Sequence, residues 1–215
     1  MSPYKRSFLE LAFDANALKF GEFTLKSGRV SPYFFNASAF SSGLQLQILG
    51  RCYRDAIAEH GVEFDGLFGP AYKGIPLASS VAVAFADQGM DYPVSFNRKE
   101  RKDHGEGGTL LGAPPNGRIL AIDDVVTAGT AVRESVDFIG NHGASLRAFC
   151  VAVDRQERGQ EGTVSALAEL SEIFQLVPMS IVTLNDILSF AADDPRVAED
   201  VAPRIEVYRG QYGAM

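Results

Sequence analysis

The chain has no tryptophan, only two cysteines among its 215 residues, and no apolar run long enough for a membrane span. Cys52 and Cys150 lie far apart, each within an apolar stretch, which favours two buried free thiols over a disulfide or a metal site. Residues 1–11 lack the apolar core of a signal peptide. These absences predict no membrane partner, a reducing environment and a cytoplasmic location.

Positive charge is also scarce, because 20 Lys and Arg face 27 Asp and Glu and the formal net charge is -7. Affinity for nucleic acid depends on many Lys and Arg side chains that neutralise phosphates, so nucleic acid is not an expected partner. An acidic protein that binds an anion must concentrate its positive charge locally. With 46% hydrophobic and 22% charged residues, the composition is that of a globular protein, and we expect a single domain over 1–215.

Helical and strand-like segments alternate along most of the chain. The expected strands are 66–69, 94–96, 119–122, 148–153 and 177–183, and the expected helices are 48–57, 75–86, 131–140 and 164–174. This alternation predicts an α/β fold with a mostly parallel central sheet and helices on both faces. Ligands of such sheets bind outside the carboxyl ends of the strands.

An N-terminal helix and a hairpin are expected before the core. Apolar residues between Ser7 and Leu18 fit a helical stripe, and Ser7 and Glu10 have the spacing of a capping box. Two extended runs, 22–26 and 29–35, flank a Ser-Gly turn and predict a hairpin. We expect residues 1–40 to form a hood outside the central sheet.

The segment 119–131 combines a buried strand, two carboxylates, a loop of small residues and the start of a helix. Backbone N–H groups and hydroxyls of the loop can converge on one anion, and the helix dipole adds positive potential there. The loop residues in question are Thr127, Ala128, Gly129, Thr130 and Ala131. Asp123 and Asp124 can accept hydrogen bonds from sugar hydroxyls and favour bound Mg²⁺, although an isolated Asp pair more often only caps a turn. The whole segment predicts a ribose-phosphate site.

The expected cationic cluster lies at residues 98–102, where four of five residues are Lys or Arg. It opens a polar, glycine-rich stretch, 98–116, that we expect to be an irregular and mobile catalytic loop. A solvated surface run is the alternative. The flanking glycines, which permit closure over a ligand, favour the functional interpretation.

The thirteen residues 119–131 resemble the signature of type I phosphoribosyltransferases, and 98–108 closely resembles the mobile catalytic loop of orotate phosphoribosyltransferases. The resemblance implies the type I phosphoribosyltransferase fold and a pentosyltransferase of pyrimidine (UMP) biosynthesis. Such an enzyme transfers the 5-phosphoribosyl group from phosphoribosyl pyrophosphate (PRPP) to N1 of orotate, giving orotidine 5′-monophosphate and pyrophosphate. It also implies Mg²⁺ bound mainly through PRPP, with no certain protein ligand, and a homodimer with shared active sites.

The same resemblance assigns residue roles, position by position. The implied catalytic residues are Lys99, Lys102, His104, Asp123 and Asp124, the first three of which would neutralise the departing pyrophosphate. The implied PRPP-binding residues are Lys26, Tyr72, Lys73, Arg98, Lys99, Lys102, His104, Asp123, Asp124, Val125, Val126, Thr127, Ala128, Gly129, Thr130 and Ala131. The implied orotate-binding residues are Lys26, Phe34, Phe35, Thr127 and Arg155, whose planar guanidinium suits a carboxylate.

Two other functions remain open from the sequence. A purine-base phosphoribosyltransferase would share 123–131 but gives no reason for Arg155 beside Phe34 and Phe35. A regulator that senses PRPP without chemistry is disfavoured by the catalytic-looking stretch 98–108 and by the acidic charge. The resemblance extends from Phe8 to Arg155 and weakens through the C-terminal helices, which we expect to serve packing.

Overall fold

A computed structural model of the chain describes residues 1–25, 27–102, 108–127, 129–158 and 164–214. Its central sheet has six strands in the order β5-β4-β3-β6-β7-β8. The strands are β3 (Gly66–Gly69), β4 (Val94–Lys102), β5 (Gly108–Gly112), β6 (Arg118–Asp123), β7 (Ser145–Asp154) and β8 (Val177–Thr183). β5 runs antiparallel to β4 and the other pairs are parallel, which confirms the expected mostly parallel sheet.

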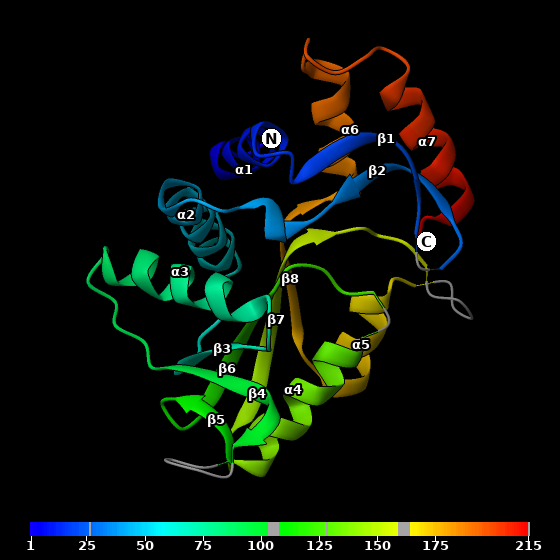
Figure 1. The fold of residues 1–215 in the computed structure, drawn as a ribbon. Coiled ribbons are helices and arrows are strands. Elements are labelled where there is room, and N and C mark those ends of the chain that lie inside the picture. The colour runs from blue at the N-terminus through cyan, green and yellow to red at the C-terminus, as the bar shows by residue number, and fades with distance from the viewer. Residues whose placement is uncertain (26, 103–107, 128, 159–163, 215) are drawn as a thin grey trace.

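Helices cover both faces of this sheet (Figure 1). One face packs against α2 (Gly43–His60) and α3 (Gly74–Ala86), and the other against α4 (Thr130–Asn141) and α5 (Ala166–Phe174). Alternate residues of β6 enter the two cores, with Leu120 and Ile122 in the first and Ile119 and Ala121 in the second. Burial on both faces explains why the strand is apolar without a break.

A hood packs over one end of the sheet (Figure 1). It contains α1 (Pro3–Asp14), the antiparallel hairpin β1 (Leu18–Thr24) and β2 (Val30–Phe35), the short helix η1 (Ala37–Ala39), and the C-terminal helices α6 (Leu184–Asp193) and α7 (Val201–Tyr212). Phe190 of α6 meets Phe13 edge-on, and Tyr208 of α7 meets Tyr33 of β2 in the same way. The C-terminal helices therefore complete the hood that the sequence predicted from residues 1–40 alone.

The first helix and the first arm of the hairpin both begin earlier than predicted. Pro3 occupies the first turn of α1, where a missing N–H costs nothing, and Ser2 is the N-cap. The predicted Ser7–Glu10 capping box is therefore wrong. Leu18 belongs to β1, since it pairs with Phe35.

The prediction of an irregular stretch over 98–116 is wrong in part. β4 continues through the basic residues to Lys102 and pairs with β5, with Asn97 opposite Leu110 and Lys102 opposite Gly108. A charged run is tolerated in such a strand when it lies near the edge of the sheet, where it discourages pairing with another chain. Residues 103–107 of the expected mobile loop lie outside the described residues.

The two cysteines agree with the sequence-based expectation, since Cys52 and Cys150 are free and buried. His60 ends α2 and His142 is the C-cap of α4. Across the described ranges, no helix combines the length and the apolar character that crossing a membrane requires.

Candidate active site

Three loops of predicted function leave the same edge of the sheet. The parallel strands β3, β6 and β7 end at Gly69, Asp123 and Asp154. From β3 the chain continues through α3 to β4 on one side, and from β6 it continues through α4 to β7 on the other. The loops after β3 and β6 therefore diverge, which makes the crevice between them the expected ligand site of such a sheet.

The two carboxylates after β6 are buried and held by hydrogen bonds. Asp123 is 8% exposed and Asp124 5%. The hydroxyl of Tyr53 donates to the Asp123 carbonyl over 2.7 Å. The backbone N–H of Asp124 donates to Asp123 Oδ1, and that of Val125 to Asp124 Oδ1, each over 2.9 Å. These bonds fix both side chains before any ligand arrives.

Burial and neighbouring charge make Asp123 unusual. Burial and, second, the negative charge of Asp124 raise its pKa to about 7, although the Asp124 N–H, Lys73 and Lys99 act in the opposite direction. Lys73 Nζ donates to Asp124 Oδ2 over 2.5 Å. The carboxylate pair is therefore costly to ionise fully and receptive to hydrogen-bond donors or cations.

The loop that follows, residues 125–131, is called the phosphate loop below. Gly129 adopts a φ of 75°, which favours glycine, and a Cβ there would lie 2.3 Å from Leu170 Cδ1 and force that side chain to shift. α4 begins at Thr130 without a side-chain cap. The first N–H groups of a helix lack partners within it, so this helix start is suited to bind an anion.

The phosphate loop is anchored on both faces of the sheet. Val125 packs against the core formed with α2 and α3, and Val126 against the core formed with α4 and α5. Thr127 and Thr130 are exposed and Ala131 is half-buried. The polar groups of the loop therefore remain accessible while its apolar side chains hold it in place.

The loop between β3 and α3 brings cations to the carboxylates. Its close packing needs glycine at both ends, since a Cβ on Gly69 would meet the Gly74 carbonyl oxygen at 2.3 Å. Tyr72 is 65% exposed, and Lys99 Nζ of β4 lies 5.9 Å from its ring centroid. Lys73 and Lys99 bring positive charge beside Asp124. Arg98, on the same strand as Lys99, is half-buried.

The predicted base-binding residues lie after β7 and on the hairpin. The Arg155 side chain is 12% exposed, and its guanidinium lies 4.7 Å from the centroid of the Tyr33 ring. Phe34 is 38% exposed and stacks on Phe23, whereas the ring of Phe35 is 7% exposed and packs in the core. Of the two predicted stacking residues, only Phe34 offers a ring to a ligand. Phe35 alternates to the buried face of the strand.

Several predicted site residues cannot be placed. Lys26, His104 and Ala128 lie outside the described residues, and the side chain of Lys102 does as well. Glu157 and Tyr33 contact Arg155 directly but were not predicted from the sequence. Only the position of Glu157, two residues after Arg155, could have indicated its contact with Arg155.

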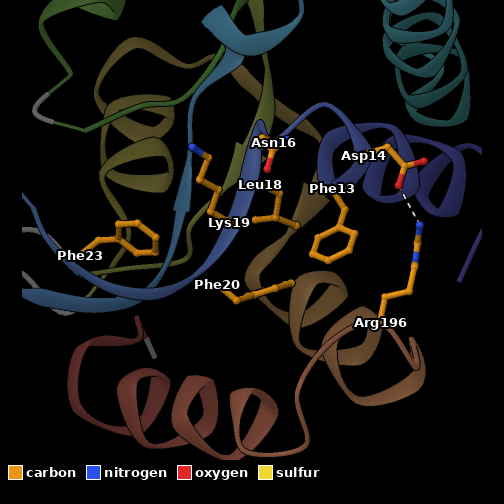
Figure 2. A pocket seen from close by; sticks show the side chains of 8 residues that line it. All are labelled: Phe13, Asp14, Asn16, Leu18, Lys19, Phe20, Phe23 and Arg196. Carbon is orange, nitrogen blue, oxygen red and sulfur yellow. Dashed lines mark hydrogen bonds and ion pairs between the residues drawn. The ribbon is translucent and has the colours of Figure 1, made fainter.

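A groove of about 450 Å³ lies elsewhere, on the hood (Figure 2). Phe13, Phe20 and Phe23 line it, and Arg196 closes one side through an ion pair of 2.7 Å with Asp14. None of the predicted catalytic residues lines this groove. The chemistry of Asp123 and Asp124 therefore places the candidate site at the sheet edge.

Comparison with known proteins agrees with this geometry. Residues 44–171 match the phosphoribosyl transferase domain family. The orotate phosphoribosyltransferase of Cronobacter sakazakii is 52% identical to this chain, and that of Yersinia enterocolitica 53% identical. Each alignment spans 214 residues, which is 99% of this chain and 100% of the relative.

Solved structures give the same result. The orotate phosphoribosyltransferase of Francisella tularensis superposes with a TM-score of 0.86 at 38% identity, covering 96% of this chain and 99% of that chain. The Mycobacterium tuberculosis orotate phosphoribosyltransferase in complex with PRPP superposes with a TM-score of 0.63 at 22% identity, covering 84% of this chain and 98% of the other. At that identity the second likeness shows the fold alone.

Proposed function

The chain belongs to the orotate phosphoribosyltransferases, and from this premise we propose which of its residues perform the transfer. The protein transfers the 5-phosphoribosyl group of PRPP to N1 of orotate, in pyrimidine biosynthesis. The observation that supports our residue assignment best is the buried pair Asp123 and Asp124, which leads directly into the uncapped start of α4.

The phosphate loop binds the 5′-phosphate of PRPP in this proposal. The N–H groups at the start of α4 and the hydroxyls of Thr127 and Thr130 supply donors, and the helix dipole supplies positive potential. Asp123 and Asp124 accept hydrogen bonds from the ribose hydroxyls. These hydrogen bonds replace the ones to water that the two carboxylates lose on burial.

The cations of β4 and of the loop before α3 face the diphosphate of PRPP. As the bond from ribose C1 to the pyrophosphate oxygen breaks, its electron pair leaves with that oxygen and negative charge grows there. Lys73 and Lys99 already lie near the carboxylates, and Lys102 and His104 are proposed to join them around the leaving group. Charge placed where charge develops lowers the barrier more than it strengthens ground-state binding.

Orotate is proposed to bind between Arg155 and the hairpin. N1 of orotate releases its proton to solvent and forms the new bond to ribose C1. Arg155 binds the carboxylate of orotate, the exposed ring of Phe34 contacts the base, and Thr127 and Lys26 add contacts. Because the base is already acidic at N1, no strong general base is needed among these residues.

Magnesium fits this site as a companion of the substrate. The described residues hold no cluster of three or more side chains that could cage a metal ion. Asp123 and Asp124 provide two carboxylates beside the proposed diphosphate position, which suits Mg²⁺, an ion that commonly combines one or two carboxylates with substrate phosphates and water. When bound, the ion would supply positive charge to the diphosphate.

The remaining features of the proposal concern the assembly. Residues 1–215 form one phosphoribosyltransferase domain, and two copies form a homodimer whose active sites are shared through the segment 98–116. We place the protein in the cytoplasm, with PRPP, orotate, orotidine 5′-monophosphate and pyrophosphate as its small-molecule partners. The family match over residues 44–171 and the full-length similarity to orotate phosphoribosyltransferases support the single domain, while the homodimer and the cytoplasmic location rest on the resemblance to the family.

A spectrophotometric assay tests the proposal. Purified protein, PRPP and Mg²⁺ are mixed with orotate, adenine or hypoxanthine, with a parallel series lacking Mg²⁺. We expect loss of orotate absorbance that needs Mg²⁺ and is matched by released pyrophosphate. In R155A, loss of orotate turnover should exceed any change in the KM for PRPP. Turnover of a purine in place of orotate would contradict the base assignment.

A further inference from the structure

Arg155 is not free to present its whole guanidinium to a ligand. Its Nε and Nη2 donate to the same oxygen, Glu157 Oε1, over 2.8 and 2.6 Å. Among the described residues, Nη1 donates no hydrogen bond, and the further contact of Nη2 is Ser31 Oγ at 3.5 Å. The edge formed by Nε and Nη2 is therefore occupied by Glu157. The edge formed by Nη1 and Nη2, called the end edge below, remains for a ligand carboxylate.

Glu157 is itself fixed from several sides. Arg29 Nη1 lies 3.5 Å from Glu157 Oε2, and the hydroxyl of Tyr33 lies 3.4 Å from Oε1. The side chains of Arg29 and Glu157 are 18% and 13% exposed. One partly buried carboxylate thus joins two arginines, and the three side chains together have a charge of about +1 when all are ionised.

The backbone brings Arg155 and Glu157 side by side. Gln156 between them adopts a φ of 49°, which is uncommon for a residue with a side chain and costs about 1–3 kcal/mol. Its N–H donates to Asp154 Oδ1 over 2.9 Å, and its side chain accepts a bond from the Asn185 N–H. These two hydrogen bonds therefore hold the strained turn that places Arg155 next to Glu157.

The C-terminal tail holds the same segment. The N–H of Arg158 donates to the Tyr212 carbonyl over 2.9 Å, and that of Ala214 to the Gln156 carbonyl over 2.8 Å. The ring of Tyr212 also lies beneath Arg29, 4.9 Å from its guanidinium. The end of α7, which the sequence analysis assigned to packing, thus supports the residues around Arg155.

We propose that Glu157 is a positioning residue for orotate recognition, which fixes the guanidinium of Arg155 so that only its end edge meets the carboxylate of the base. The inference rests on the proposed role of Arg155. The charge of about +1 on the cluster matches one ligand carboxylate, so the arrangement selects an anionic base over a neutral one. Because the Arg155 side chain is already fixed, less conformational entropy is lost when the ligand binds.

The test compares E157Q with K5Q, which removes a partly buried ion pair with Asp186 at the hood, away from the base site. E157Q keeps the size of the side chain and removes its charge. We expect its KM for orotate to rise about tenfold, since a small misplacement of a binding group has effects of that order, with the KM for PRPP within about twofold of wild type. K5Q should leave both KM values unchanged, and its melting temperature should be comparable to that of E157Q.

Equal increases in both KM values, or an orotate KM that is unchanged or lower in E157Q, would overturn the inference and leave the proposed function intact. A wild-type chain that consumes no orotate would overturn the proposed function and this inference with it. If E157Q does not fold, Y33F removes only the hydroxyl that reaches Glu157. It should raise the orotate KM about two- to threefold without changing the KM for PRPP, and an unchanged value would again contradict the proposal.

Discussion

The two sides of the active site are built in opposite ways. Asp123, Asp124 and the phosphate loop are buried or half-buried at their base, anchored in both cores and held by hydrogen bonds of 2.7–2.9 Å. The basic strand β4 lies next to the edge strand β5, and its residues Lys99 and Glu100 are exposed. One side is fixed by packing in both cores, while the other presents exposed charged side chains from a strand paired within the sheet.

This difference suggests a division of labour. A ribose phosphate that keeps its structure through the reaction is best bound by rigid groups, because rigid groups lose little entropy on binding. The departing pyrophosphate gains charge only during the reaction, so cations placed around it stabilise the transition state more than the ground state. We therefore expect changes in the phosphate loop to alter stability and PRPP binding together, and changes in β4 to alter turnover alone.

The largest effect on stability is expected at Gly129. In G129A, the positive φ and the contact with Leu170 should together lower the free energy of unfolding by about 2–4 kcal/mol and kcat/KM for PRPP by about 100-fold. Urea unfolding and steady-state kinetics measure both quantities. G143A is the matched control, because Gly143 also has a φ of 79° but nothing within 4 Å of an added Cβ. It should lose stability through backbone strain alone, with normal kinetics, and equal effects of the two variants would contradict the role of Leu170.

The next effect concerns the pH dependence of stability in the absence of substrate. Because the folded-state pKa of Asp123 is raised to about 7, the folded protein binds more protons than the unfolded chain between about pH 4 and 7. Its stability therefore falls as the pH rises through that window. D123N should be more stable than wild type at pH 8, by about 2–3 kcal/mol more than at pH 5, while losing activity.

Asp65 is the control for this pH effect. Its hydrogen bonds with Arg118 lower its pKa to about 2, so its contribution to stability is complete above about pH 4 and is lost only as the pH falls towards 2. D65N should therefore leave the slope between pH 5 and 8 unchanged. A D123N variant whose advantage over wild type does not grow with pH would show that Asp123 is not a destabilising buried acid.

The smallest effect is expected at Lys73, which links the two sides. Its side chain is 48% exposed, so the ion pair with Asp124 contributes about 0–1 kcal/mol to stability despite its short distance. K73A should lower kcat/KM for PRPP about tenfold and leave the unfolding midpoint in urea nearly unchanged. A clear loss of stability with normal PRPP kinetics would make Lys73 a structural partner of Asp124 instead.

The sequence predicted the sheet and the start of α4 well because their signals are local. The apolar run before Asp123 and the small residues from Gly129 to Ala131 each specify a backbone geometry within one turn or strand. The strands β3, β6, β7 and β8 were placed to within three residues at either end. In such segments, burial and backbone conformation follow from neighbouring residues alone.

The sequence failed where a distant partner decides the outcome. β4 extends to Lys102 because β5 pairs with it, and β1 begins at Leu18 because Phe35 lies opposite. The contact between Arg155 and Tyr33 joins β7 to the hairpin, and no spacing along the chain shows which neighbour Arg155 has. Glu157 could have been suspected from its position, but its second partner, Arg29, could not.

The most direct test of this division of labour is the effect of K102A on two quantities measured on one preparation, kcat for orotate consumption and the dissociation constant of Mg²⁺–PRPP. We predict that kcat falls about 100-fold or more while the dissociation constant changes less than about threefold, because the lost charge acts on the departing pyrophosphate. A dissociation constant that weakens as much as kcat falls, or an unchanged kcat, would contradict the account.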